Sequence, residues 1–135
     1  MTENRKENKQ EIYVDVCVVG GGAAGLSAAA GAVQLCMDTA LIERAQMGGD
    51  CLYTGCVPSK SLIAAAETAH TFACCEDFGI RAQTPKIDFG AVMAHLRRVI
   101  REIEPHDSPE RYEAMGVRIF HDTARFINEK QLQAG

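Results

Sequence analysis

The sequence lacks any excess of positive charge: 14 Lys and Arg residues stand against 18 Asp and Glu residues, and the net charge is −4. Because nucleic-acid binding requires Lys and Arg to neutralise phosphates, no nucleic-acid partner is expected. Cysteine is also scarce, with 6 in 135 residues, a density below that of small disulfide-stapled scaffolds. A reducing, cytoplasmic setting is therefore expected, in which a disulfide is more often catalytic than structural.

Long apolar runs are missing as well. Residues 1–11 are polar and charged, whereas a signal peptide has an apolar run there, so we predict a disordered tail. Residues 16–37 carry no charge, and this stretch is long enough to span a membrane. This stretch is rich in glycine and alanine, however, and its consecutive glycines would interrupt a lone helix. No membrane partner is expected.

What the sequence does contain is an alternation of strands and helices. With 47% apolar and 24% charged residues, it can build the core of about one domain. Residues 12–19 and 39–43 are predicted to be strands. Within the first, residues 16–19 are apolar without alternation, which is typical of a strand buried on both faces of a parallel sheet. The other predicted elements are helices over 23–35, 59–74 and 89–104, a loop over 44–56, a short helix ending at Gly116, and strands over 117–121, 124–127 and 131–134.

These elements predict an α/β fold, a Rossmann-like dinucleotide-binding domain with a parallel sheet and flanking helices. Asp88 is expected to cap the helix over 89–104, and Ser108 opens the next one with a capping-box pattern. The final strands predict the start of an antiparallel meander. We therefore expect residues 12–135 to be the N-terminal portion of a domain that is incomplete here.

A glycine-rich motif directly follows the first predicted strand and opens the next helix. Residues 20–25 are Gly-Gly-Gly-Ala-Ala-Gly, which satisfies the dinucleotide-binding pattern G-x-G-x-x-G. In that pattern Gly20 permits a tight turn, Gly22 lets the backbone approach a pyrophosphate, and Gly25 lets the helix pack close to the sheet. The first N–H groups of the helix then bind the phosphates.

An acidic residue at the end of the second predicted strand strengthens this interpretation. Glu43 lies about 18 residues beyond Gly25, where dinucleotide-binding folds place a carboxylate that binds ribose hydroxyls. The alternative is a glycine-rich loop that binds no ligand. The preceding strand, the following helix and the acidic residue at the right spacing together argue against that alternative. The motif by itself does not separate FAD from NAD.

Two cysteines, Cys51 and Cys56, lie five positions apart in the predicted loop. Cys56 stands at a predicted helix start, where the helix dipole favours a thiolate, and Lys60 adds a positive charge one turn further on. We therefore predict two thiols of low pKa, suited to thiol–disulfide exchange. Gly48 and Gly49 give the backbone the freedom to pass near a planar ligand.

The cysteine spacing alone leaves other interpretations open. Two buried cysteines without chemistry are common, because a free thiol packs as a small hydrophobic group. A zinc site would need a second pair at ligand spacing, which the adjacent Cys74 and Cys75 do not supply. No third cysteine follows Cys56 closely enough for an iron–sulfur cluster. No metal ligands are assigned.

The segment from Gly48 to Lys60, Gly-Gly-Asp-Cys-Leu-Tyr-Thr-Gly-Cys-Val-Pro-Ser-Lys, resembles the active-site signature of the class I pyridine nucleotide-disulfide oxidoreductases. The glycine motif and Glu43 stand at the FAD-binding positions of that family and in the same order. The resemblance covers residues 12–135. It implies that FAD is the bound dinucleotide, that NAD(P)H is the co-substrate bound by a domain outside this chain, and that the parent enzyme is a homodimer acting in cell redox homeostasis.

The resemblance also implies roles for individual residues. Cys51 resembles the interchange thiol, which forms a mixed disulfide with substrate, and Cys56 the charge-transfer thiol, which lies against the flavin. Lys60 would lie near the reactive nitrogen of the flavin. The other implied cofactor contacts are the backbone of Ala23 and Ala24 at the pyrophosphate, Gly49 and Asp50 beside the first cysteine, and the Thr123-Ala124 stretch at the adenine.

Two departures from the family pattern bear on these roles. Asp50 stands where many members carry threonine, and its carboxylate would be repelled by a pyrophosphate unless it turns away. The family's acid–base histidine lies in a region beyond this chain. None of the histidines present fits that role. His106 lies in a capping-box turn, and the others are expected to be surface or partly packed residues: His70, His95 and His121.

The implied activity moves electrons between NAD(P)H, FAD and a Cys51–Cys56 disulfide and acts on a disulfide or dithiol substrate such as dihydrolipoamide. Ser59-Lys60 is closer to the lipoamide- and mercuric-type members than to glutathione reductases. Mercuric-ion reduction is one alternative. A nucleotide-binding module without turnover is another, and these 135 residues alone are expected to be inactive although the parent enzyme is active.

Overall fold

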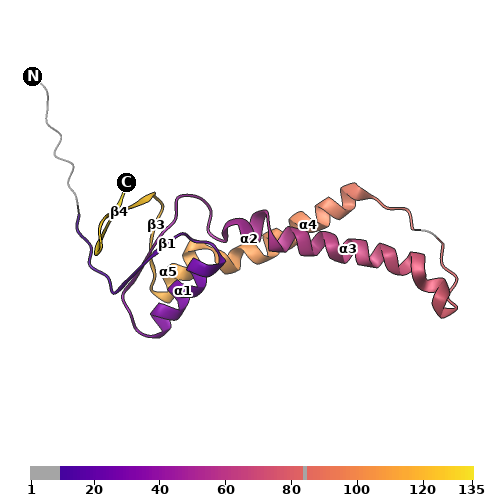
Figure 1. Ribbon diagram of the computed structural model, residues 1–135, viewed down its shortest axis with the longest axis horizontal. Helices are drawn as coiled ribbons and strands as arrows, with labels where there is room; N and C mark the ends of the chain where they lie inside the picture. Colours follow the sequence, from indigo (N-terminus) through magenta and orange to yellow (C-terminus); the bar gives the residue numbers. More distant parts are fainter. Residues whose placement is uncertain (1–9, 84) are drawn as a thin grey trace, which may run out of the picture.

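The computed structural model describes residues 10–83 and 85–135, so residues 1–9 of the predicted tail lie outside the described residues. The molecule is elongated, with a small α/β body at one end and a projection of two helices at the other (Figure 1). The body holds the glycine motif, and the cysteine motif lies where the body meets the projection.

The body is built on a parallel sheet of three strands in the order β1-β2-β3. These strands are β1 (Val16–Val19), β2 (Thr39–Ile42) and β3 (Arg118–Phe120). Every residue of the central strand β2 is buried. Burial on both faces is predicted for residues 16–19, but β1 is only half-buried and ends in the exposed Val19, because it lies at the edge of the sheet. The predicted α/β fold with a parallel sheet is confirmed.

Two helices pack onto this sheet. α1 (Ala23–Gln34) connects β1 to β2, and α5 (Pro109–Met115) precedes β3. The Ser108 hydroxyl accepts from the Arg111 N–H at 3.4 Å, so the predicted cap of α5 is confirmed. α5 ends, as predicted, at Gly116, whose φ is 105°. The buried core cluster joins α1, β2, α5 and the loops beside them: Leu26, Ala29, Leu41, Met47, Tyr112 and Val117.

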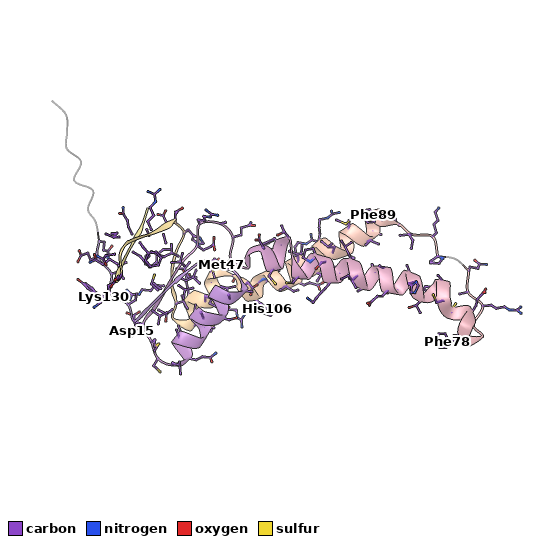
Figure 2. All side chains as sticks on the ribbon, in the orientation of Figure 1. Asp15, Met47, Phe78, Phe89, His106 and Lys130 are labelled. Carbon is purple, nitrogen blue, oxygen red and sulfur yellow. The ribbon has the colours of Figure 1, made fainter. Side chains whose placement is uncertain are left out.

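The projection, which we call the arm, consists of α3 (Cys56–Cys74) and α4 (Phe89–Ile103), and the two helices pack along each other. Asp88 caps α4 as predicted, because its carboxylate accepts from the Ala91 N–H at 3.0 Å. The short 3₁₀ helices η1 (Cys75–Phe78) and η2 (Glu104–Asp107) follow α3 and α4. Side chains project freely along the arm (Figure 2), and Phe78 at its outer end is 82% exposed.

The C-terminal strands form a separate two-stranded antiparallel hairpin beside the sheet. β4 (Ala124–Asn128) pairs with β5 (Gln131–Ala134), which confirms the predicted start of an antiparallel meander. In the described part of the chain, no helix combines the length and the hydropathy that crossing a bilayer requires.

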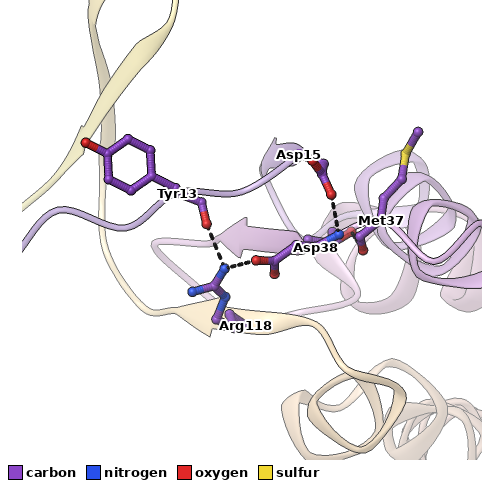
Figure 3. A network of polar contacts seen from close by, with 6 residues as sticks. Tyr13, Asp15, Met37, Asp38 and Arg118 are labelled. Carbon is purple, nitrogen blue, oxygen red and sulfur yellow. Dashed lines mark hydrogen bonds and ion pairs between the residues drawn. The ribbon is translucent and has the colours of Figure 1, made fainter.

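The first strand begins at Val16 and not at residue 12. The chain before it is held by one backbone hydrogen bond, from the Asp15 N–H to the Asp38 carbonyl at 2.9 Å, and by side chains. The Asp38 N–H donates to the Asp15 carboxylate at 2.9 Å. Arg118 donates to the Asp38 carboxylate and, at 2.9 Å, to the Tyr13 carbonyl (Figure 3). We call these contacts the polar clamp. It joins the chain ahead of β1 to the amino ends of β2 and β3.

The prediction of a continuous loop over residues 44–56 is wrong. The segment contains a five-residue helix, α2 (Gly49–Tyr53), and α3 begins at Cys56, before Pro58. Proline is tolerated there because the N–H groups of a first helical turn have no partner within the helix. The cysteine motif is therefore helix, one tight turn and helix, with Cys51 and Cys56 in different helices.

Candidate active site

The glycine loop between β1 and α1 has the geometry that its motif predicts. Gly20 has φ 100°, and its N–H donates to the Ile42 carbonyl at 2.8 Å. A Cβ atom on Gly25 would lie 1.8 Å from the Gly20 carbonyl oxygen, so only glycine lets α1 pack this close to the loop. Beside Gly22, by contrast, no heavy atom lies within 4 Å of an added Cβ position. The predicted roles of Gly20 and Gly25 in the turn and the packing are confirmed.

The N-terminus of α1 opens from this loop. Gly22 is its N-cap residue, and no side chain caps the helix. Ala23 and Ala24 are exposed in the first turn, where N–H groups have no partner within the helix. The exposed N–H groups and the helix dipole fit the negative charge of a pyrophosphate, so these residues can hold a dinucleotide such as FAD.

Glu43 follows β2 and closes the glycine loop from the other side. One carboxylate oxygen accepts from the Gly21 N–H at 2.5 Å and the other from the Ala45 N–H at 2.7 Å. Burial opposes ionisation of this carboxyl group, but the hydrogen bonds from Gly21, Ala45 and Arg44, with the charge of Arg44, hold the pKa of Glu43 below its usual range. A charged carboxylate is therefore present where the sequence predicts a ribose ligand.

A second glycine pair joins the glycine loop to the cysteine motif. The Gly48 N–H donates to the Gly21 carbonyl at 2.8 Å, and Gly48 forms a parallel bridge with Gly22. A Cβ atom on Gly49 would lie 2.9 Å from Gly22 Cα, and one on Gly48 would lie 2.6 Å from the Leu52 side chain. Close packing of glycine on glycine therefore places α2 directly against the glycine loop. This packing of Gly21 and Gly48 is not predicted from the sequence, in which the consecutive glycines are its one signal.

The two cysteines of the motif lie beside each other as free thiols. Cys51 is half-buried in α2, and Cys56 is exposed in the first turn of α3. A hydrogen bond between the two thiols raises the pKa of Cys51, and burial adds to the effect. The positive charge of Lys60 lowers that pKa but is outweighed. The prediction of a low pKa is thus wrong for Cys51, because the neighbouring Cys56 thiol and burial outweigh the charge of Lys60.

The other predicted site residues lie in α2 and at the start of β4. Gly49 and Asp50 form the first turn of α2, and the Asp50 carboxylate accepts from the Thr54 hydroxyl at 3.3 Å. Ala124 begins β4, two residues after Asp122, whose N–H donates to the Glu43 carbonyl at 3.0 Å. Every histidine is exposed: His70, His95, His106 and His121. Across residues 10–83 and 85–135, no three His, Cys, Asp or Glu side chains form a group that could hold a metal ion.

The site thus combines a dinucleotide-type glycine loop with a short helix that packs against it and carries Cys51. The chain belongs to the pyridine nucleotide-disulphide oxidoreductase family, because the sequence model of that family matches residues 14–134. This confirms the class of flavoprotein enzymes that the cysteine signature resembles. FAD and NAD(P)H use follow at the level of the family.

Characterised relatives carry two different names. The chain is 40% identical over 87 residues to the dihydrolipoyl dehydrogenase of Zymomonas mobilis, covering 64% of this chain and 19% of the relative. It is 32% identical over 120 residues to the mercuric reductase of Streptomyces lividans, covering 88% of this chain and 25% of the relative. The chain thus spans about a fifth to a quarter of the length of these relatives.

A solved structure supports the fold. The chain superimposes on a Cu(II) complex of the HOCl-induced flavoprotein disulfide reductase RclA from Escherichia coli with a TM-score of 0.68. The match covers 88% of this chain and 24% of that chain, at 22% sequence identity.

Proposed function

We propose that this chain is the N-terminal part of the FAD-binding domain of an oxidoreductase in which Cys51 and Cys56 alternate between a disulfide and two thiols. The observation that carries the proposal is geometric: Cys51 lies in a helix packed against a glycine loop that can hold a dinucleotide, and Cys56 begins the next helix after one tight turn. Free thiols that can approach each other from two helices are what reversible disulfide formation requires.

Each part of the glycine loop has a role in holding FAD. The N–H groups of Ala23 and Ala24 bind the pyrophosphate, with Gly20, Gly22 and Gly25 providing the close backbone approach. The Glu43 carboxylate binds the adenosine ribose, since each of its oxygens has a further lone pair after accepting from the loop. Gly49 and Asp50 border the pyrophosphate, Lys60 the flavin, and Ala124 the adenine.

FAD supplies two-electron chemistry when bound, and the cysteines carry those electrons to or from a sulfur substrate. Reduction of the Cys51–Cys56 disulfide takes up two electrons and two protons and leaves two thiols. The Cys51 thiolate then attacks a substrate disulfide, which forms a Cys51–substrate bond and releases one substrate thiol. Attack by Cys56 on that mixed disulfide releases the second thiol and restores the Cys51–Cys56 bond. A dithiol such as dihydrolipoamide passes through the same steps in reverse.

The remaining features of the proposal concern the whole enzyme. NAD(P)H binds a further domain, which the greater length of the relatives supports. Exposed apolar side chains on the arm, such as Phe72 and Phe89, support assembly as a homodimer. Free cysteines throughout the described residues fit a reducing cytoplasm and a role in cell redox homeostasis.

The test is turnover by the purified full-length protein with NADH or NADPH. Three substrates separate the possibilities: lipoamide, glutathione disulfide and mercuric ion. We expect lipoamide turnover, with a loss of at least about 1,000-fold in Cys51→Ser and in Cys56→Ser, because the nucleophile or its partner is gone. Cys36→Ser is the matched control, since Cys36 is an exposed free thiol outside the motif.

The other outcomes point to the alternatives. Turnover of mercuric ion with none of lipoamide or glutathione disulfide would favour the mercuric-type activity named by the Streptomyces relative. Stoichiometric FAD without turnover of any substrate would favour a nucleotide-binding module. Lipoamide turnover that survives both serine substitutions would overturn the proposed role of the cysteine pair.

A further inference from the structure

The tyrosine between the two cysteines joins the redox motif to the base of the arm. Tyr53 is the last residue of α2, and its hydroxyl donates to the Glu104 carboxylate at 2.8 Å. Glu104 opens η2, directly after the last residue of α4. Both side chains are half-buried, so water competes less for this hydrogen bond than at an open surface.

The Tyr53 hydroxyl stays protonated, and so remains a donor, across the physiological range. Burial, the hydrogen bond to Glu104 and the negative charges of Glu104 and Asp107 raise the pKa of Tyr53 to about 12. A neutral phenol that donates to a carboxylate makes a charge-assisted hydrogen bond, which is stronger than a bond between neutral groups.

The glycine loop holds one side of α2, where Gly48 and Gly49 pack against Gly21 and Gly22. The Asp50 carbonyl accepts from Thr54 and Gly55, but those bonds lie within the motif itself. Leu52 is buried beneath Gly48 and provides an apolar anchor that does not orient the helix about its own axis. Apart from the contact between the two thiols, the Tyr53–Glu104 bond is the one hydrogen bond from an α2 side chain to another helix among residues 10–83 and 85–135.

This bond acts on the thiols through a shared neighbour. Cys51 lies two residues before Tyr53 in α2, whereas Cys56 begins α3, which packs along α4. Glu104 follows α4, so the bond places α2 relative to the same helix against which α3 packs. A disulfide requires its two Cβ atoms about 3.5–4.5 Å apart, while two thiols tolerate a wider spacing. A loosened α2 therefore disfavours the disulfide more than the dithiol.

We propose that Tyr53, through Glu104, is a positioning residue that holds Cys51 at disulfide-forming distance from Cys56. The inference rests on the proposed redox function of the pair. It predicts that loss of the phenolic hydroxyl shifts the thiol–disulfide equilibrium toward the dithiol, without removal of any atom from either cysteine.

The experiment measures that equilibrium directly, without turnover of the enzyme. The purified protein is equilibrated with mixtures of glutathione and glutathione disulfide, trapped by alkylation and mapped by mass spectrometry at Cys51 and Cys56. In this equilibrium the protein disulfide and two glutathione molecules give the protein dithiol and one glutathione disulfide. We expect Tyr53→Phe to shift the constant about fivefold toward the dithiol, as expected for partial loss of a hydrogen bond to a charged group.

A matched control is available in Tyr13→Phe. Tyr13 is 82% exposed, and its hydroxyl also donates to a carboxylate, that of Glu11 at 3.2 Å. We expect no change in the equilibrium constant for this variant. Glu104→Gln is the second test, because glutamine keeps an acceptor but removes the charge. It should shift the constant in the same direction as Tyr53→Phe and by less.

The possible failures are distinguishable. A constant within twofold of wild type in Tyr53→Phe, with the fold intact by circular dichroism, overturns the positioning role while leaving the redox function in place. If Tyr53→Phe does not fold, an unchanged constant in Glu104→Gln overturns it instead. A wild-type protein that never forms the Cys51–Cys56 disulfide overturns the proposed function itself.

Discussion

The body and the arm are built in opposite ways. In the body, Ala29, Leu41 and Thr39 are completely buried, and helix, sheet and loops share one core. In the arm, the 19-residue helix α3 has no buried residue in the described structure, and α4 has only Leu96. The stability of the fold therefore resides in the body. The redox motif lies between the two, with α2 packed on the body and Cys56 in the first turn of the arm.

The largest effect is expected in the body at Gly25. Gly25→Ala would place a Cβ atom 1.8 Å from the Gly20 carbonyl oxygen, so α1 must move away from the loop. We expect a loss of about 3 kcal/mol or more in the free energy of unfolding, measured by urea denaturation.

Gly31→Ala in the same helix is the control. An added Cβ at Gly31 has no neighbour within 4 Å, so this variant should gain about 0.5–1 kcal/mol from helix propensity. If Gly25→Ala and Gly31→Ala were equally stable, the body would not be tightly packed at Gly25, and the contrast between body and arm would fail there.

A smaller effect is expected at Glu43, where a charged side chain orders the glycine loop. Glu43→Gln replaces one charge-assisted acceptor and should lower the free energy of unfolding at pH 7 by about 1 kcal/mol. The folded-state pKa of Glu43 lies below its unfolded value. Its contribution is therefore present above pH about 4.5 and is lost as the pH falls through the folded pKa.

Urea denaturation at several pH values measures this contribution. Wild type and Glu43→Gln should differ at pH 7 and converge in acid. Glu129→Gln, in the exposed turn between β4 and β5, should match wild type throughout. A constant difference between wild type and Glu43→Gln at all pH values would contradict the ionised carboxylate.

The polar clamp should contribute less than the glycine loop. Arg118→Met removes the ion pair with Asp38 and the hydrogen bond to the Tyr13 carbonyl. Because the Arg118 and Asp38 side chains are 41% and 53% exposed, we expect a loss of about 0.5–1 kcal/mol, smaller at high salt. Thermal denaturation at low and at 1 M salt tests this. A salt-independent loss above that range would place the clamp in the core instead of at its edge.

The smallest effect is expected on the arm. Ile63→Ser alters a side chain that is 54% exposed, so the free energy of unfolding should change by less than about 0.5 kcal/mol. Leu96→Ala in α4 is the contrast, since Leu96 is 6% exposed and its truncation should cost about 2 kcal/mol. Equal losses at Ile63 and Leu96, measured by urea denaturation, would mean that the outer face of α3 is covered.

Much of the body is predictable from local sequence signals. The parallel strands follow from apolar runs without alternation, and the turn at Gly20 and the packing at Gly25 follow from a motif in which each glycine has a steric reason. The helix caps made by Ser108 in the body and by Asp88 in the arm are also predictable, because in each the donor and the acceptor lie three residues apart.

What the sequence does not reveal depends on contacts between distant residues. Helix α2 has only five residues, and the burial of Leu52 against Gly48 stabilises it more than helix propensity does. The Tyr53–Glu104 bond joins residues that are 51 positions apart. The raised pKa of Cys51 likewise depends on where the Cys56 thiol lies once both helices are in place.

The most direct test of the account is disulfide mapping of the protein after oxidation with glutathione disulfide. Peptides from wild type are separated without reduction, and the partner of each cysteine is identified by mass spectrometry. The account predicts one internal disulfide, between Cys51 and Cys56, with Cys17 and Cys36 remaining free of protein disulfides. A disulfide that joins Cys51 to any other cysteine, or an oxidised protein in which Cys51 and Cys56 never pair, would contradict it.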